Sequence, residues 1–264
     1  MPNKQVVFIT GASGGLGAAL VKYYGQQGAV LGLCGRRADA LEKVADGLNA
    51  HCYVADVRDA HAMQSAAQDF IACAGVPDIV IACAGISVGV LTEEADDLPA
   101  FQAVMDANVM GLVHTFQPFI APMKARGCGA ESGNQSSGVL CGISSVAGVR
   151  GLPGGSAYSA SKAATRVYLE SLRLELKSSG IHVVTVAPGY IATPMTAVNP
   201  YPMPFKMSAE SAANKVARAI RKRSRHVTIP WQMAVVAFLL QALPRSIYDR
   251  LFEKAPRKPR GLKT

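Results

Sequence analysis

Seven short runs of β-branched and other apolar residues alternate along this chain with longer stretches of helical periodicity. Such alternation predicts βαβ units, in which helices connect parallel strands and cover the sheet. The runs are apolar on both faces, as strands buried between two helical layers are. The sequence therefore predicts an α/β fold of the three-layer, doubly wound type with a seven-stranded, mostly parallel sheet. We expect its strands at residues 6–10, 30–33, 52–56, 79–82, 139–143, 182–187 and 227–229.

A glycine-rich turn, TGASGGLG, follows the first expected strand at residues 10–17 and opens a helical stretch. Its glycines would allow a tight turn and a close approach to a pyrophosphate, which the free N–H groups of the helix start would bind. The alternative is an ordinary flexible turn, but the flanking strand and helix favour a dinucleotide site. The cofactor-binding candidates in this turn are Gly11, Ser13, Gly14, Gly15, Leu16 and Gly17.

Two arginines follow the second expected strand. A dinucleotide-binding fold that takes NAD usually carries an acid here for the adenosine ribose 2′-OH, but this chain has Gly35 followed by Arg36 and Arg37. Guanidinium groups would bind the 2′-phosphate of NADP through charge-assisted hydrogen bonds. The alternative is that both arginines merely solvate a helix start, where cations oppose the helix dipole. The pattern predicts NADP(H) as the cofactor.

A second constellation consists of ISSVAG at residues 143–148 and YSASK at residues 158–162. On a helix, Tyr158 and Lys162 lie one turn apart on the same face, so the ammonium can approach the phenol. A phenol with a reference pKa near 10 is a poor acid–base catalyst at neutral pH, and an adjacent cation favours the phenolate. Ser145, at the end of a strand, can hydrogen-bond the same carbonyl oxygen. The set predicts proton transfer at a carbonyl oxygen.

The glycine-rich turn, the Ser-Tyr-Lys set and the segment PGYIATPM resemble the short-chain dehydrogenase/reductase superfamily over about residues 4–230. The resemblance implies a Rossmann-like fold and NADP(H)-dependent interconversion of a carbonyl and a secondary alcohol. It implies that Tyr158 is the general acid or base, that Lys162 lowers its pKa and holds the nicotinamide ribose, and that Ser145 orients the substrate carbonyl. Asn108, in DANVMG, matches the asparagine that supports a water relay to the lysine. The other positions that match cofactor contacts are Asp56, Val57, Ala84, Gly85, Pro188, Gly189, Ile191 and Thr193.

One segment departs from the family pattern, which usually has Asn-Asn-Ala-Gly after the fourth strand where this chain has ACAG at residues 82–85. Ala84 and Gly85 are kept, so the backbone approach to the adenosine ribose should survive. The hydrogen bond from the first asparagine to the neighbouring sheet is lost at Ala82. Similar variants occur in family members that reduce lipid-like ketones, such as 3-ketosphinganine reductases, which hints at a hydrophobic substrate.

We expect one dinucleotide-binding and catalytic domain over residues 1–264, with two special segments. Residues 193–210 begin with TPMTAVNPYPMPF, which is irregular, apolar and interrupted by prolines, as a substrate lid is. Residues 231–264 form an apolar, then basic, C-terminal extension, and the stretch from residue 215 onward carries 13 Lys and Arg against two acidic residues. Another long loop, at residues 127–138, has little to bury and predicts a surface insertion.

The apolar stretch WQMAVVAFLLQAL would form a helix about 20 Å long, too short for a hydrocarbon core of roughly 30 Å. Its apolar side must be covered by the substrate cleft, by a subunit interface or by an anionic membrane surface. The net charge of +9 resides in this C-terminal part, and the rest of the chain is nearly neutral. The extension lacks interleaved aromatic residues among its charges, so we expect no nucleic-acid partner.

The remaining features limit the other function classes. Six cysteines without a CxxC pair and a start without a signal-peptide pattern favour the cytoplasm, with peripheral membrane contact as an alternative to internal packing. The histidines show no metal-ligand spacing, so we expect no metal. The acidic pairs at residues 93–94 and 96–97 predict a solvated helix start.

We expect a small-molecule carbonyl or alcohol substrate and a homodimer or homotetramer formed through the helices that contain Asn108 and Tyr158. A catalytically silent NADP-binding regulatory or scaffold protein is the alternative function.

Overall fold

A seven-stranded parallel sheet forms the centre of the computed structural model, which describes residues 4–128 and 137–261. The strand order is β3-β2-β1-β4-β5-β6-β9, and every registered pair in it is parallel. The order changes direction between β1 and β4, which is the switch point where doubly wound sheets bind ligands. The strands are β1 (Val6–Thr10), β2 (Val30–Gly35), β3 (Ala50–Val54), β4 (Ile79–Ala82), β5 (Gly138–Ile143), β6 (Ile181–Pro188) and β9 (His226–Ile229).

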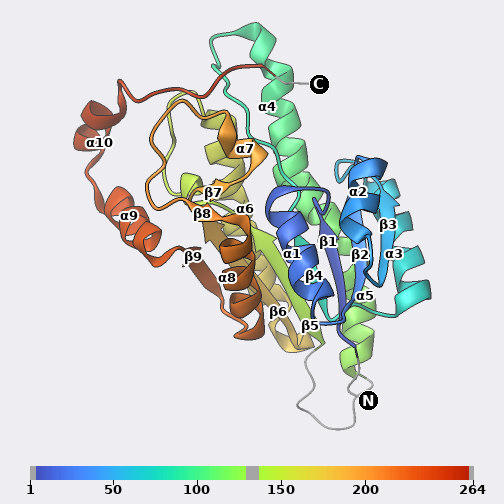
Figure 1. Ribbon diagram of the computed structural model, residues 1–264. Coiled ribbons are helices and arrows are strands. Elements are labelled where there is room, and N and C mark those ends of the chain that lie inside the picture. Colours follow the sequence, from blue (N-terminus) through green and yellow to red (C-terminus); the bar gives the residue numbers. More distant parts are fainter. Residues whose placement is uncertain (1–3, 129–136, 262–264) are drawn as a thin grey trace.

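Helices cover both faces of this sheet (Figure 1). Their bounds are α1 (Gly15–Gly25), α2 (Ala38–Ala45), α3 (Ala60–Ala74), α4 (Leu98–Met105), α5 (Gly111–Cys128), α6 (Ser156–Glu175), α7 (Pro194–Ala197), α8 (Ala209–Arg221), α9 (Trp231–Ala242) and α10 (Arg245–Phe252). Successive residues of β1 point to opposite faces, so Val7 and Ile9 pack with α1 and α8 while Phe8 packs with α3, α5 and α6. The two resulting apolar clusters confirm the expected three-layer architecture.

All seven expected strands exist; β2, β5, β6 and β9 are one or two residues longer than expected, and one strand is displaced. The third strand lies at Ala50–Val54 instead of 52–56, because its partner β2 begins at Val30 and pairs Leu31 with Ala50. A second, two-stranded sheet, β7 (Ile191–Ala192) with β8 (Met207–Ser208), was not expected and joins the two ends of the lid segment. Most of the expected loop at residues 127–138 lies outside the described residues.

The helix that carries Asn108 contains a local widening. α4 continues through a π-helical segment, Asp106–Met110, directly into α5. A π-bulge of this kind inserts one residue into the helical ladder and often marks a functional site. Here it brings the Asn108 side chain to the loop that follows β4, as the hydrogen bonds below show.

The C-terminal extension leaves the sheet at its β9 edge. In Figure 1, α9 and α10 lie at the periphery beyond β9, and the end of the chain then runs back to the region of α4. The Arg150 guanidinium donates to Leu240 O and Leu243 O, each at 3.1 Å, and so holds the last turn of α9. Within the described ranges, no helix is long and apolar enough to cross a membrane.

Candidate active site

Most of the candidate residues collect at the carboxyl ends of β1, β2, β4, β5 and β6. The glycine-rich turn follows β1, Arg36 and Arg37 follow β2, and Ala84 and Gly85 follow β4. Ser145 comes two residues after β5, and Pro188 is the last residue of β6. Because parallel strands end at the same edge of a sheet, these segments surround one region.

The glycine-rich turn is built for close approach. Gly11 has φ +68°, and a Cβ there would lie 2.8 Å from the Ala84 N and Cα atoms. A Cβ on Gly17 would overlap the Gly11 carbonyl oxygen, so both positions need glycine. Helix α1 then begins at Gly15 without a side-chain cap or an acidic residue in its first turn. Its first N–H groups therefore form the kind of cradle that a pyrophosphate fits.

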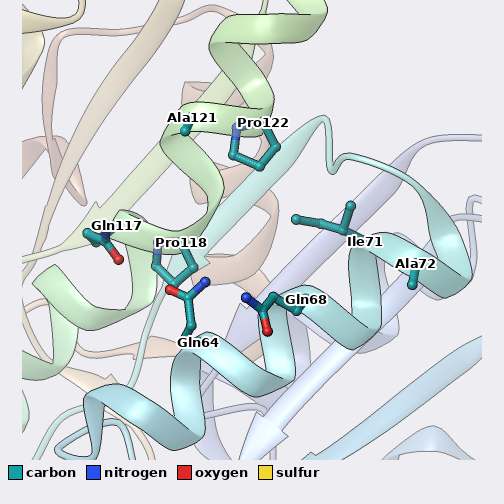
Figure 2. Close-up of a pocket in the computed structure, with 8 residues that line it drawn as sticks. All are labelled: Gln64, Gln68, Ile71, Ala72, Gln117, Pro118, Ala121 and Pro122. Atoms are coloured by element: carbon teal, nitrogen blue, oxygen red, sulfur yellow. The ribbon is translucent and has the colours of Figure 1, made fainter.

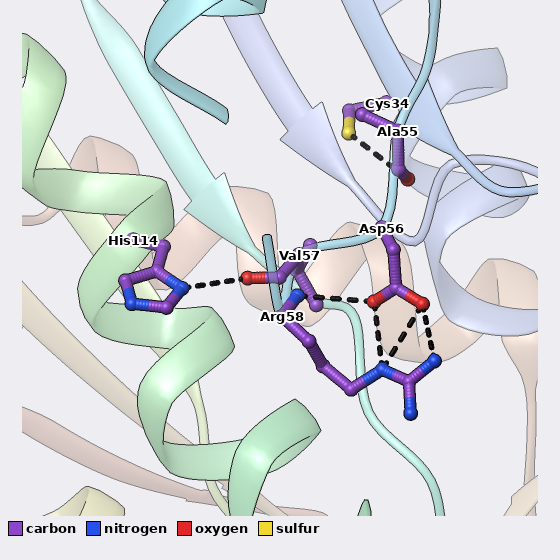
Figure 3. Close-up of polar contacts among 6 residues, drawn as sticks. All are labelled: Cys34, Ala55, Asp56, Val57, Arg58 and His114. Atoms are coloured by element: carbon purple, nitrogen blue, oxygen red, sulfur yellow. Dashed lines mark hydrogen bonds and ion pairs between the residues drawn. The ribbon is translucent and has the colours of Figure 1, made fainter. Parts of the chain in front are cut away.

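Two arginines lie beside this turn. The Arg37 guanidinium donates to Ser13 O at 3.3 Å, and the exposed Arg36 contributes to lowering the pKa of Asp56. Figure 3 shows the main cause of that lowered pKa, a two-pronged hydrogen bond from Arg58 to the Asp56 carboxylate at 2.7–3.1 Å. The carbonyl oxygen of the next residue, Val57, lies 3.0 Å from His114 Nδ1, and this contact fixes the Val57 backbone. Cationic groups thus line the end of the turn.

The segment after β6 folds over the same turn. A Cβ on Gly15 would lie 3.2 Å from the Thr193 methyl, so Thr193 sits directly above the start of α1. Thr193 caps α7, and its side chain and that of Thr196 form a reciprocal capping box. The neighbouring Ile191 is buried in the core. Gly189 faces α9, where a Cβ would lie 2.6 Å from Met233 Cγ.

Tyr158, Lys162 and Ser145 converge next to this cradle. The Lys162 ammonium lies 5.8 Å from the centre of the Tyr158 ring and donates to Ile143 O at 2.9 Å. Burial raises the pKa of Tyr158, and the hydrogen bond with Ser145 opposes that rise. Burial lowers the pKa of Lys162 to about 8, and the neighbouring Cys83 opposes that shift.

Asn108 links the π-helical segment to the loop after β4 and to the start of α6. Its Nδ2 donates to Ile86 O at 3.0 Å and to Ser161 Oγ at 2.9 Å, while its Oδ1 accepts from the Ile86 N–H at 2.8 Å. A Cβ on Gly85 would lie 2.8 Å from Asn108 Oδ1 and 3.6 Å from Lys162 Nζ. The loop after β4, the π-bulge and the start of α6 are therefore fixed around Lys162.

Comparisons with known proteins bear on this arrangement. The short chain dehydrogenase family model matches residues 5–201. The chain belongs to the short-chain dehydrogenase family. An uncharacterized oxidoreductase of Myxococcus xanthus is 33% identical over 249 residues, which cover 93% of this chain and 95% of that protein. An Arabidopsis thaliana protein named 11-beta-hydroxysteroid dehydrogenase 1A is 30% identical, with 86% of this chain and 68% of that protein covered.

A solved short-chain dehydrogenase from Burkholderia cenocepacia, crystallised with NADP, superposes with a TM-score of 0.80 at 26% identity. The match covers 94% of this chain and 98% of that one. The relatives and the fold identify an oxidoreductase of a family that uses nicotinamide dinucleotides. No group of three or more His, Cys, Asp or Glu that could hold a metal occurs among the described residues.

The electrostatics of this short-chain dehydrogenase differ from the expectation in one respect. We expected Lys162 to lower the pKa of Tyr158, yet the pKa is raised, with burial as its largest cause. The Lys162 ammonium donates to the backbone carbonyl oxygen of Ile143 and lies 5.8 Å from the centre of the Tyr158 ring. After β4, where ACAG at residues 82–85 departs from the family pattern, the Thr10 hydroxyl fixes the end of the strand. It donates to Ile81 O at 3.5 Å and accepts from Ala84 N at 3.4 Å.

The sequence did not reveal that the end of the chain borders the site. The Lys258 ammonium donates to Ser87 Oγ at 2.9 Å and to Met195 O at 3.4 Å, and so links the loop after β4 to the lid segment. Arg260 Nε donates to Asp97 Oδ2 at 2.8 Å, and Asp97 also accepts from Leu91 N. The expectation of a solvated pair is therefore wrong for Asp97, which is buried. We call residues 256–260 the C-terminal strap.

Removing the Asp97 carboxylate should loosen this strap. In Asp97→Asn, Arg260 keeps only its ion pair with Glu94, so we expect faster amide hydrogen exchange at residues 89–91 and 256–260 in peptide-resolved measurements. The control is Glu253→Gln, because Glu253 is exposed and lies on the same end of the chain. Equal exchange in Asp97→Asn and the wild type would show that the ion pair between Asp97 and Arg260 does not hold the strap.

A groove between α3 and α5 lies outside this site. Figure 2 shows it lined by glutamines, prolines and small apolar residues: Gln64, Gln68, Ile71, Ala72, Gln117, Pro118, Ala121 and Pro122. None of these residues is titratable or nucleophilic, and none is a candidate site residue. The groove therefore offers no chemistry that competes with the region around Tyr158.

Proposed function

We propose that this protein is an NADP(H)-dependent oxidoreductase that interconverts a carbonyl and a secondary alcohol, with Tyr158 as general acid and base. The observation that carries the proposal is the convergence of Tyr158, Lys162 and Ser145 beside the glycine-rich cradle. The Lys162 ammonium is buried 5.8 Å from the centre of the half-buried Tyr158 ring, and buried ionisable groups of this kind are concentrated at functional sites. The Asn108 hydrogen bonds that fix this region support the same function.

The cradle around Gly11 and Gly17 fits a dinucleotide, because its backbone leaves no space for side chains and opens onto the start of α1. When bound, the nicotinamide donates or accepts the hydride. The residues proposed to hold the cofactor are the turn from Gly11 to Gly17, Arg36, Arg37, Asp56, Val57, Ala84, Gly85, Tyr158, Lys162, Pro188, Gly189, Ile191 and Thr193. Thr193, which lies over Gly15, would close the cofactor site from the lid side.

The protein's own residues handle the proton. In the reduction, the Tyr158 hydroxyl donates its proton to the carbonyl oxygen as negative charge develops there, and in the oxidation the phenolate removes it. Ser145, which interacts with Tyr158, donates to the same oxygen and fixes its position. The Lys162 ammonium, 5.8 Å from the centre of the Tyr158 ring, would hold the nicotinamide ribose beside the phenol. Asn108 acts by holding the loop and helix that border Lys162, where it would support a water relay.

We propose NADP(H) over NAD(H) because Arg36 and Arg37 directly follow β2, where chains that bind NAD usually carry an acid. The Burkholderia relative was crystallised with NADP, which agrees with this preference. In the variant Arg36→Ala/Arg37→Ala, we expect the Kd for NADPH to rise about tenfold or more, with the Kd for NADH little changed. Titration of cofactor fluorescence measures both constants.

The matched control for that experiment is Lys43→Ala, which removes an exposed cation from α2 without touching the turn. Only the arginine variant should lose NADPH affinity. An equal loss for NADPH and NADH would mean that the arginines do not read the 2′-phosphate, and the NADP(H) preference would then be wrong.

A hydrophobic or lipid-like substrate fits the lid segment at residues 193–210, where Met195, Val198 and Phe205 remain exposed. The Arabidopsis relative is named as a dehydrogenase of a hydroxysteroid, which is a substrate of this class. Tyr201 belongs to the same segment and stacks edge-on with Tyr190 at a ring distance of 6.4 Å. The lid would close over such a substrate through these apolar side chains.

We propose a homodimer or homotetramer formed through α5 and α6, because Val167 and Leu174 expose apolar surface on α6. The cysteines whose side chains the structure describes are all free thiols, which supports the reducing cytoplasm.

The alternative of a silent NADP-binding scaffold predicts cofactor binding without turnover. The complete set of Tyr158, Lys162, Ser145 and Asn108 favours the enzyme.

A further inference from the structure

Helix α9 turns an apolar stripe outward. Trp231, Val235, Phe238 and Leu239 are 69%, 49%, 69% and 59% exposed, and their spacing of four, three and one residues places them along one side of the helix. The same helix contains no charged residue. A helix of this composition on a protein surface normally has its apolar side covered.

The inner side of α9 is already occupied, so the stripe cannot turn inward. Met233 is buried against Gly189, and Arg150 binds the carbonyl oxygens of the last turn. Tyr248 of α10 donates to Gly151 O, and the Arg150 guanidinium lies 4.2 Å from the centre of its ring. Both helices are thus fixed to the loop that follows β5. The cover for the stripe must come from outside the chain.

The neighbouring helix extends the stripe and adds positive charge. On α10, Ile247 and Leu251 are 48% and 64% exposed and lie one turn apart. Arg245, Arg250 and Lys254 are exposed on or next to the same helix and outnumber its two exposed acids, Asp249 and Glu253. Apolar side chains flanked by cations match a lipid surface with anionic headgroups.

A second copy of the chain suits this face less well. A two-fold interface places the same patch of both subunits together, so the excess positive charge of both α10 helices would gather at one contact. Anionic headgroups would instead neutralise them. We propose that α9 and α10 dock this protein on an anionic lipid surface, with the stripe of Trp231, Val235, Phe238 and Leu239 in the interfacial layer. Because Met233 rests on Gly189, the docked face adjoins the segment that leads into the lid.

The chain contains one tryptophan, and it lies at the start of the stripe, so its fluorescence reports docking directly. Adding vesicles of phosphatidylcholine mixed with phosphatidylserine should shift the Trp231 emission to shorter wavelength. Brominated acyl chains in those vesicles should quench it. Vesicles of phosphatidylcholine alone should bind more weakly, and added salt should weaken the binding to phosphatidylserine. The assay needs neither cofactor nor substrate, so it is independent of the proposed enzymatic activity.

Two variants separate the apolar and charged contributions. Phe238→Gln/Leu239→Gln should lower the partition coefficient about tenfold or more, because it removes two of the exposed apolar side chains. Arg245→Gln/Arg250→Gln should lower it about thirtyfold on phosphatidylserine vesicles and little on phosphatidylcholine. The matched control is Val54→Gln, since Val54 is exposed to a similar extent on β3 at the other edge of the sheet.

Two results would overturn the proposal. One is wild-type protein that shows no emission shift and no quenching with phosphatidylserine vesicles. The other is a Phe238→Gln/Leu239→Gln variant that binds vesicles as the wild type does. Light scattering distinguishes the competing occupant: if the wild type fails to bind lipid and the same variant turns an oligomer into monomers, the stripe is a subunit interface.

Discussion

The variant Tyr158→Phe is expected to lose turnover by a factor of about 10²–10⁴, which is the usual contribution of a general acid–base group. Phenylalanine keeps the half-buried ring in its place and removes only the hydroxyl that would carry the proton. The affinity for NADPH should therefore stay close to that of the wild type. Single-turnover measurement of NADPH oxidation, together with a cofactor titration, checks both parts.

The control for this variant is Tyr168→Phe. Tyr168 lies on the same helix, α6, and burial raises the pKa of its phenol too, but its ring packs with the core cluster beneath α5 and α6. Its hydroxyl should be dispensable for turnover. Undiminished turnover in Tyr158→Phe would remove Tyr158 from the mechanism.

The second large effect is expected from Gly17→Ala. An alanine Cβ at this position would overlap the Gly11 carbonyl oxygen, so the start of α1 would have to move away from the end of β1. Such overpacking costs about 3 kcal/mol of unfolding free energy, or roughly 10 °C in Tm for a chain of this size. The displaced N–H groups should also weaken the binding of NADPH.

Gly14→Ala is the matched control for stability. Gly14 has φ 179°, which any residue adopts, and a Cβ there meets only the end of the Arg37 side chain, at 3.8 Å. Thermal unfolding without cofactor compares the two variants. An equal Tm for Gly17→Ala and the wild type would show that the turn has room for a side chain, and the close-packed cradle would be wrong.

The sequence predicted the sheet well because its strands are short, apolar and separated by helical stretches. The strand at residues 79–82 was found to the residue, since its run IVIA is bounded by polar and small residues. The third strand was displaced because its limits depend on pairing with β2, which local periodicity does not encode. The pair β7–β8 is only two residues per strand, too short for any periodic signal.

The site was predictable where its residues follow one another along a strand end or a helix turn. Tyr158 and Lys162 lie one helical turn apart, and the glycine-rich turn is contiguous in sequence. The contact between Lys258 and Ser87 joins residues 171 positions apart, and that between Arg260 and Asp97 joins residues 163 apart. No local pattern reports such pairs, so the C-terminal strap could be found only in the fold.

The direction of the Tyr158 pKa shift shows a different limit. Sequence spacing indicated a cation near the phenol, and the structure has one 5.8 Å from the ring centre. The spacing of residues along a sequence does not report how far water is excluded from them. Burial is the largest cause of the raised Tyr158 pKa. The position of a charge could be predicted, whereas its effect depended on the packing around it.

The central claim is that this short-chain dehydrogenase reduces a hydrophobic carbonyl with NADPH. The most direct measurement is NADPH oxidation by the wild type against a panel of 3-keto lipids, steroids and small ketones, with NADH in parallel. We expect turnover of apolar ketones with NADPH, weaker turnover with NADH, and turnover lower by a factor of about 10²–10⁴ in Tyr158→Phe. Tight NADPH binding without turnover of any ketone, or of the corresponding alcohols with NADP⁺, would contradict it and favour the scaffold alternative.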